Sequence, residues 1–453
     1  MQQQEKFSKQ NWQILILFGL IGQIAWSVEN MYFNLFVFDT VAPNLDAVTL
    51  MVQLSGLVAT VTTLIAGTLS DKTGNRRKFI SYGYVIWGIT VALFGFLSVE
   101  LTNTLFNVDT ATAITITLAA VIVGDCVMTV FGSTANDAAF NAWVTDNTKE
   151  EFRGKVEGVL SVLPLFAMLI VAGGFGIIKD IIGYSYLFLS LGVLISVCGI
   201  IGIFKVKDSP TLEKKGSLKD IFYGFKASVV KENKPLYLTL LVMGVYGVAC
   251  QIFMPYLIIY MQYYLRFSTI EYSIVFGLAI VIGAVVNVLL GGVTDRLDKT
   301  KLLYIAAAVF SVGLLGMYFM HFNDKAVTLI TFGVAGCIMI CGYIFVSALC
   351  GAVVRDNTPE KDAGKLQGIR MIFSVLIPMF VGPMIGNTIN KIMNIPLDSG
   401  NAADAMTTQY LPAPEIFLAG AICAALMFTV IPFLVKANKK AKLLKKEKVT
   451  DVA

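Results

Sequence analysis

The sequence predicts an all-α membrane protein with twelve transmembrane helices in two six-helix, pseudo-symmetric bundles. Of its 453 residues 56% are apolar and only 14% are charged, and the mean hydropathy is +0.74. A soluble enzyme needs a more highly charged surface, so this composition excludes one. Twelve apolar runs are long enough for a bilayer core, which takes roughly 20 helical residues. Each of two charged motifs has one copy in the first half of the chain and one copy in the second half, which indicates an internal duplication.

The apolar runs fall into two groups of six. The first group covers residues 12–38, 47–69, 79–99, 113–139, 158–178 and 185–204. The second group covers residues 236–261, 270–293, 302–320, 326–350, 366–389 and 411–435. We therefore expect an N-terminal bundle over residues 1–204, a basic cytoplasmic linker over 205–235 and a C-terminal bundle with a basic tail over 236–453. The linker contains an amphipathic stretch, residues 218–230, that is expected to lie along the membrane surface.

The distribution of positive charge predicts the topology. If the loops after the odd-numbered spans lie outside, only four of the 35 Lys and Arg residues lie there, namely Lys179, Arg266, Lys325 and Lys391. The other 31 lie on the inner side, which places both termini in the cytoplasm and the protein in the cytoplasmic membrane. The first 11 residues are too polar for a cleavable signal peptide.

Composition also limits the expected cofactors and partners. All seven cysteines fall inside expected spans, so no disulfide framework is indicated and they read as small core residues. No metal and no cofactor are expected. The net charge of +5 comes from inner loops and the tail, where anionic lipid headgroups are a sufficient partner and nucleic acid is not needed. We expect a monomer in the bilayer.

The first repeated motif joins the second and third spans. Residues 67–78, GTLSDKTGNRRK, concentrate charges that would be costly in hydrocarbon, so the loop is expected at the membrane surface. At an offset of 224 residues, four of its positions recur in the second half. Gly67, Asp71, Lys72 and Arg77 correspond to Gly291, Asp295, Arg296 and Lys301.

The second repeated motif joins the fourth and fifth spans of each half. Residues 146–158, DNTKEEFRGKVEG, and residues 356–368, DNTPEKDAGKLQG, match at seven of thirteen positions with a constant offset of 210. Each copy predicts a helix end, an acidic Asn-Thr turn and a new helix start. Arg153 has Ala363 as its counterpart.

These motifs resemble two inner loops of major facilitator superfamily transporters, the loop between spans two and three and the loop between spans four and five. Because both occur in both halves, the resemblance covers essentially the whole chain and implies the major facilitator fold. The segment that begins FNAWVTDNT at position 140 and the long basic linker are similar to glycoside-pentoside-hexuronide:cation symporters and to sucrose/proton symporters. The melibiose-carrier branch has two aspartates in span two for sodium, and the corresponding residues here are Ala59 and Thr63, which argues against that sodium site.

Two such halves around a polar gap predict transport by alternating access, with the inner loops as latches. The expected cytoplasmic gate comprises Gly67, Asp71, Gly74, Arg76, Arg77, Asp146, Arg153, Gly291, Asp295, Arg296 and Asp356. In this hypothesis Asp71 pairs with cations of the other half when the inner side is closed. The same charges could instead be ordinary determinants of topology.

The candidates for proton coupling are the acidic residues inside spans, Glu29, Asp125 and Asp137. An intramembrane carboxyl group can take up and release one proton in each transport cycle. Asp125 is the deepest of them by count, with Glu29 a little nearer the outside. A hydrogen-bonded structural acid is the alternative for each. The single histidine, His321, is expected at an outer edge.

The candidates for solute binding are amide and aromatic residues, which suit sugar hydroxyls better than an apolar drug. They are Gln23, Trp26, Asn30, Tyr32, Asn34, Gln251, Tyr256, Tyr260 and Asn287, to which we add Arg370 as a cation that could meet an anionic sugar. The same polar residues could serve only to pack helices, and Arg370 could be a lipid anchor.

The predicted function is secondary active transport of a saccharide or similar small polar solute by proton symport. A proton-driven exporter of amphipathic compounds is the alternative. An intramembrane enzyme is disfavoured, because no span carries a His/Glu metal pair or a Ser/His arrangement and no nucleotide-binding loop is present. A receptor without transport activity is a further reading.

Overall fold

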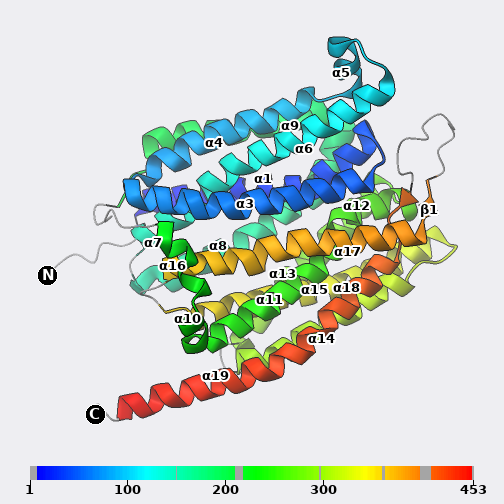
Figure 1. Ribbon diagram of the computed structural model, residues 1–453. Helices are drawn as coiled ribbons and strands as arrows, with labels where there is room; N and C mark the ends of the chain where they lie inside the picture. The colour runs from blue at the N-terminus through cyan, green and yellow to red at the C-terminus, as the bar shows by residue number, and fades with distance from the viewer. Residues whose placement is uncertain are drawn as a thin grey trace. The chain divides into compact units, whose positions relative to one another are not determined.

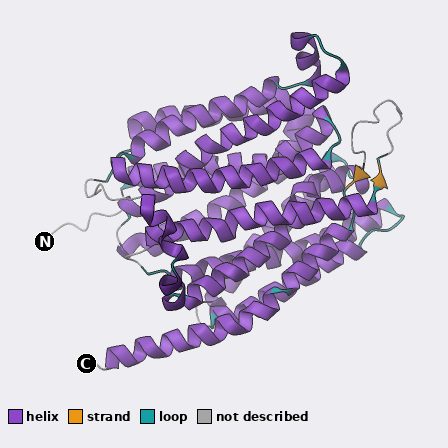
Figure 2. Ribbon diagram, in the orientation of Figure 1, coloured by secondary structure: helices purple, strands orange, loops and turns teal. Residues whose placement is uncertain are grey.

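The computed structural model describes residues 8–148, 150–209, 218–294, 297–359, 363–397 and 410–450. The chain divides into two compact units. Unit 1 comprises Met1–Leu218, Ser268–Ser273 and Ile395–Leu411, and unit 2 comprises Lys219–Phe267, Ile274–Asn394 and Pro412–Ala453. Nearly all of the described chain is helical (Figure 2).

The α-helices of unit 1 run from the N-terminus to the start of the linker (Figure 1). They are α1 (Lys9–Val28), α2 (Asn34–Phe36), α3 (Leu45–Thr73), α4 (Arg76–Leu93), α5 (Val99–Phe106), α6 (Thr110–Gly132), α7 (Asn141–Asn147), α8 (Glu150–Ile170) and α9 (Gly176–Lys205). Short π-helical or 3₁₀ segments extend several of them, namely η1 (Glu29–Phe33), η2 (Val37–Val41), η3 (Phe94–Phe96), η4 (Ser133–Phe140) and η5 (Val171–Phe175).

Unit 2 contains most of the remaining helices. They are η6 (Leu218–Phe225), α10 (Ala227–Glu232), α11 (Lys234–Phe253), η7 (Met254–Tyr256), α12 (Leu257–Ile259), η8 (Tyr260–Tyr264), α13 (Thr269–Thr294), α14 (Lys299–Phe319), α15 (Lys325–Asn357), α16 (Ala363–Met371), η10 (Ile372–Leu376), α17 (Ile377–Met393), α18 (Glu415–Ala425) and α19 (Met427–Thr450). The first turn of α13 and one residue of η6 belong to unit 1. Two short strands, β1 (Ile395–Pro396) and β2 (Tyr410–Leu411), pair antiparallel in a loop for which no strand was predicted.

Eleven helical stretches of the described chain are long and apolar enough to cross a membrane. Ten of them correspond one to one with predicted spans. The stretch Gly158–Lys205 contains two predicted spans, 158–178 and 185–204, in 48 residues. Gly183 interrupts its helical backbone with φ 77° and ψ 167°, a conformation open to glycine because it lacks a Cβ. The chain is therefore a multi-pass membrane protein.

The turn between α3 and α4 follows from three residues of the first motif. Gly74 has φ 63° and ends α3 in the left-handed conformation that glycine favours at this position. Asn75 then caps α4, because its Oδ1 accepts a hydrogen bond from the backbone N–H of Lys78 at 3.2 Å. Gly74 and Asn75 together therefore end one helix and start the next.

Helices α4 and α9 pack closely through glycines (Figure 1). A Cβ on Gly88 would lie 2.4 Å from the carbonyl oxygen of Gly192, and a Cβ on Gly199 would lie 2.5 Å from the backbone nitrogen of Val85. Because any side chain would force the backbones apart, small residues hold this pair together, as is common in membrane helices.

The end of the linker is part of unit 2 and packs against its helices. Val229 of α10 joins a buried apolar cluster with Leu236 and Leu240 of α11 and Ile369 of α16. The stretch 218–230, predicted to be amphipathic, thus places part of its apolar side against the helices that follow it.

Candidate functional site

A buried polar cluster in unit 1 centres on Glu29, whose side chain is 6% exposed. The hydroxyl of Ser55 donates to Glu29 Oε1 at 2.7 Å, and the hydroxyl of Thr129 lies 3.5 Å from the same oxygen. Ser55 Oγ and Thr129 Oγ1 are 3.0 Å apart. Helices α3 and α6 thus both contribute a hydroxyl to the carboxyl group at the end of α1.

Asp125 belongs to the same cluster. It is 1% exposed, lies one helical turn before Thr129 on α6, and is close to Ser55. Neither Asp125 Oδ1 nor Glu29 Oε2 has a hydrogen-bond partner among the described atoms. Each of the two buried carboxyl groups therefore keeps one oxygen without a hydrogen bond.

Asp137 lies at the other side of this cluster, on η4. Its Oδ2 accepts a hydrogen bond from Ser133 Oγ at 3.0 Å, and the indole of Trp26 is nearby. The three predicted coupling residues therefore lie in one unit, around α1, α3 and α6. Their hydrogen-bond partners in the described part of the chain are hydroxyl groups rather than cations.

Two π-helical segments carry two of these three carboxyl groups, whereas Asp125 lies on α6. Glu29 opens η1, and Ser133 and Asp137 lie in η4. A π-helical turn is rare and is found frequently at functional sites, where the extra residue in the turn changes the direction of side chains. The sequence did not predict these segments, because a π-helical turn depends on local hydrogen bonding that composition does not encode.

Aromatic residues support the cluster from α4. The rings of Trp26 and Trp87 lie 5.0 Å apart, and those of Tyr84 and Trp87 lie 5.4 Å apart. The hydroxyl of Tyr84 lies 2.8 Å from the carbonyl oxygen of Phe18 and 3.0 Å from Asn136 Oδ1. These contacts fix Trp26 against the cluster.

The solute candidates on the first helix differ in exposure. Gln23 and Trp26 are half-buried and Asn30 is exposed, whereas Tyr32 and Asn34 are buried. Asn30 Nδ2 donates to the carbonyl oxygen of Trp26 at 2.8 Å. Asn34 Nδ2 donates to the carbonyl oxygen of Asn30 at 2.9 Å. Gln23, Trp26 and Asn30 therefore remain the accessible members of this group.

Two of the solute candidates of unit 2 are tyrosines with buried side chains. Tyr256 and Tyr260 are fully buried. Tyr256 donates to the carbonyl oxygen of Pro383 at 3.0 Å, and the ring of Tyr260 lies 5.0 Å from that of Phe417. Because both are packed into the core of unit 2, we leave them out of the proposed solute site.

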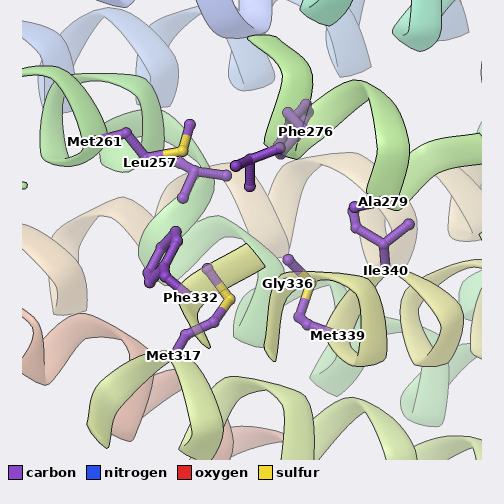
Figure 3. Close-up of a pocket in the computed structure, with 10 residues that line it drawn as sticks. Leu257, Met261, Phe276, Ala279, Met317, Phe332, Gly336, Met339 and Ile340 are labelled. Carbon is purple, nitrogen blue, oxygen red and sulfur yellow. The ribbon is translucent and has the colours of Figure 1, made fainter. Parts of the chain in front are cut away.

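The remaining candidates of unit 2 lie on three different helices. Gln251 on α11 and Asn287 on α13 are half-buried, and Arg370 on α16 is exposed. A small cavity also lies within unit 2 (Figure 3), and all ten residues that line it are apolar or glycine: Leu257, Met261, Val275, Phe276, Ala279, Met317, Phe332, Gly336, Met339 and Ile340. A cavity without polar groups does not suit a polar solute.

Arg76 is the centre of the first charged loop. It is 4% exposed. Its Nε donates to Asp146 Oδ2 at 3.0 Å, and its Nη atoms contact Asp71 and Ser70. The described partner of Asp71 is therefore a cation of its own unit, whereas the latch hypothesis pairs it with cations of the other half.

The other gate residues are placed only in part. Arg77 donates its backbone N–H to Asp208 Oδ1 at 2.8 Å, and Gly67 lies inside α3. In unit 2, Lys299 Nζ lies 2.8 Å from Asp356 Oδ2, so the second acidic motif also pairs with the start of a neighbouring helix. Gly291 lies in α13, and the expected roles of Asp295, Arg296 and the Arg153 side chain lie outside the described residues.

Ser55, Thr129 and Asp208 belong to these sites but were not predicted from the sequence. Ser and Thr are common inside membrane helices, where most donate to a carbonyl one turn back, as Thr60 does to Gly56 at 2.9 Å. Only the packing of α3 against α6 shows that Ser55 points to Glu29 instead. Asp208 could not be recognised from the sequence, because one acidic residue in a basic linker is not conspicuous.

Comparisons with known proteins identify the family. The family model described as Major Facilitator Superfamily matches residues 15–383. No curated protein matches the sequence. Among solved structures, the crystal structure of a mutant of the nucleoside transporter NupG is similar to this chain, with a TM-score of 0.67 and 9% sequence identity. The similarity covers 94% of this chain and all of that one, and at this identity it shows the fold alone. The match of the family model over most of the sequence shows that the chain belongs to the Major Facilitator Superfamily.

Proposed function

We propose that the chain is a proton-coupled symporter of a saccharide or a similar small polar solute. Membership of the superfamily supports secondary transport as such. The observation that carries the proposal of proton coupling is the cluster of Glu29, Asp125 and Asp137, which is surrounded by hydroxyl groups. The solute class rests on the amides and the indole of the first helix.

The cluster suits a site that exchanges protons. An ionised carboxylate within the membrane is costly unless a cation or several donors compensate it. Two neighbouring carboxylates also repel each other, and a hydroxyl group offers only one donor. A proton on one carboxyl group removes a charge, and a change in the surroundings during transport can release it again. This gives Glu29 and Asp125 a role that a purely structural acid does not need.

The same helix connects the proton site with the proposed solute site. Gln23, Trp26 and Asn30 precede or follow Glu29 by at most two helical turns, and Trp26 lies beside Asp137. A solute held by these residues would bias the packing of α1, and with it the hydrogen bonds of Glu29. Symport requires such coupling between two sites, which is a free energy of about 1 to 3 kcal/mol in typical proteins.

The first experiment identifies the solute. Purified protein is screened by thermal shift against sugars, nucleosides and amphipathic drugs at two pH values. Nucleosides enter the panel because they carry a sugar and because the similar solved structure is a nucleoside transporter. A compound that stabilises the protein is then tested for counterflow in proteoliposomes.

The second experiment tests the direction and the coupling. An inward proton gradient is expected to drive accumulation of the solute, and dissipating the gradient is expected to leave only counterflow. Cells that express the protein should gain uptake of the solute. If they gain resistance to amphipathic compounds instead, the exporter is the correct reading, and binding without counterflow would identify a receptor.

We further propose that both termini lie in the cytoplasm and that the membrane is the cytoplasmic one. The excess of Lys and Arg in the loops on one side supports this orientation.

A further inference from the structure

A cavity of about 240 Å³ lies in unit 1 beside the start of α4, away from the carboxyl cluster. The residues that line it are Asn75, Arg77, Lys78, Ser81, Tyr82, Ile203 and Asp208. They come from the first turns of α4, the last turn of α9 and the beginning of the linker. The proposed transport cycle uses neither Lys78 nor Ser81.

The cavity has an excess of positive charge. Arg77 and Lys78 are exposed cations, and Asp208 is the one carboxylate among the lining residues. Asp208 accepts the backbone N–H of Arg77 at 2.8 Å, and the guanidinium of Arg77 contacts the carbonyl oxygen of Ile203. The positive end of the α4 dipole also lies here, which favours an anion.

Ser81 supplies an independent indication of a ligand. Its side chain is 1% exposed, and its hydroxyl has no hydrogen-bond partner among the described residues. A buried hydroxyl without a partner costs free energy. Since Ser81 lines the cavity, an oxygen of a bound anion would give this hydroxyl an acceptor.

Two exposed apolar ridges adjoin the cavity. On α4 the ridge consists of Tyr82, Ile86, Ile89 and Leu93, and on α9 it consists of Val193, Val197, Ile200 and Phe204. Both have the spacing of one helix face, and the two helices lie side by side (Figure 1). Tyr82 lines the cavity itself and Phe204 follows its lining residue Ile203, so each ridge starts at the cavity.

We propose that this cavity binds the phosphate group of an acidic phospholipid, with the acyl chains along the two apolar ridges. Arg77, Lys78 and the start of α4 supply positive charge, and Ser81 donates a hydrogen bond to a phosphate oxygen. A free phosphate shares the headgroup chemistry but makes no use of the ridges. The continuity of cavity and ridges therefore favours the lipid.

The test is native mass spectrometry of the full chain in detergent, titrated with phosphatidylglycerol or with phosphatidylcholine of the same acyl chains. We expect preferential binding of phosphatidylglycerol. Lys78→Gln should weaken it by about fivefold, as expected for the loss of one basic residue at a lipid surface. Ser81→Ala should weaken it by a similar factor, because one donor to a charged group is lost. Thermal unfolding of each variant confirms that the fold is retained.

Lys439→Gln is the matched control, because Lys439 is an exposed basic residue on α19, outside the cavity. It should leave the preference unchanged. Equal weakening by Lys439→Gln would show a diffuse charge effect and overturn the site. Displacement of the lipid by glycerol 3-phosphate at equal concentration would show that a free phosphate compound suffices and overturn the role of the ridges. Equal binding of both lipids would overturn the proposal as a whole.

Discussion

Glu29 is an exception to the rule that charged groups avoid the membrane interior. Its neighbours in the sequence are apolar or amide residues, and its side chain is buried beside Ser55 and Thr129. Neither hydroxyl removes the charge of a carboxylate. The residue therefore fits a role in which its protonation state changes.

We predict that Glu29→Gln and Asp125→Asn each abolish uptake driven by a pH gradient. Both amides keep the size of the side chain but cannot exchange a proton. Counterflow should persist in at least one of the variants, because exchange of solute without net transport needs no proton cycle. Glu100→Gln is the control, since Glu100 is exposed on α5. Full retention of gradient-driven uptake in both variants would end the proposal of proton coupling through these residues.

Arg76 is the second residue whose surroundings decide its role. We predict that Arg76→Gln lowers the free energy of unfolding by about 2 kcal/mol, because it leaves the carboxylates of Asp71 and Asp146 without their cation. Lys299→Gln should cost less than about 1 kcal/mol, since both side chains of the Lys299–Asp356 pair are more accessible to solvent. Thermal unfolding in detergent compares the two. An equal loss of free energy of unfolding in both variants would contradict the expectation that the buried ion pair contributes more to stability.

At the scale of elements, the sequence predicted the spans well. Ten predicted runs correspond to separate helical stretches, and the other two lie within Gly158–Lys205. Hydropathy is informative here because a helix that crosses the bilayer needs about 20 predominantly apolar residues. The sequence did not predict the π-helical segments η1 and η4 or the β1–β2 pair, because these depend on local hydrogen bonding that composition does not encode.

The candidate site was predictable in part for the same physical reason. An acid inside an apolar run is conspicuous, so Glu29, Asp125 and Asp137 could be chosen from the sequence. Ser55 and Thr129 could not be chosen in this way, because Ser and Thr are common in membrane helices. Tyr256 and Tyr260 were chosen for their chemistry, but only packing shows that they are buried in the core of unit 2.

The packing of α4 against α9 gives a prediction for these elements. Gly88→Ala should destabilise the protein by about 1 to 3 kcal/mol, because the new Cβ would lie 2.4 Å from the backbone oxygen of Gly192. Gly351→Ala on α15 is the control, since a Cβ there meets no atom within 4 Å. The control should be neutral or stabilising by up to about 1 kcal/mol through helix propensity. Thermal unfolding measures both, and a neutral Gly88→Ala would contradict the close packing.

At the scale of the whole molecule, the repeated motifs give both units charged pairs between neighbouring helices. Arg76 pairs with Asp146 in unit 1 and Lys299 pairs with Asp356 in unit 2. Asp146 and Asp356 are equivalent in the repeat of 210 residues. The carboxylates of the two pairs are thus related by the repeat, whereas the cations are not, since Arg76 corresponds to Thr300 at the offset of 224 residues.

We predict that reversing the charge of Asp71, as in Asp71→Lys, abolishes uptake while the protein still inserts into the membrane. The new cation would face Arg76 and would also be unable to serve as a latch in alternating access. Uptake in whole cells and the amount of protein in the membrane fraction are the measurements. Glu100→Lys, an equal change of charge at an exposed position of α5, should leave uptake intact. Unchanged transport by Asp71→Lys would refute the latch.

We propose that the carboxyl cluster of unit 1 links proton movement to solute movement. Its most direct test is to add the identified solute to proteoliposomes without a gradient and to record the external pH. We expect the external medium to become more alkaline as solute and protons enter together, and we expect Glu29→Gln and Asp125→Asn to abolish this signal. Solute entry without any change of pH in the unmodified protein would contradict it.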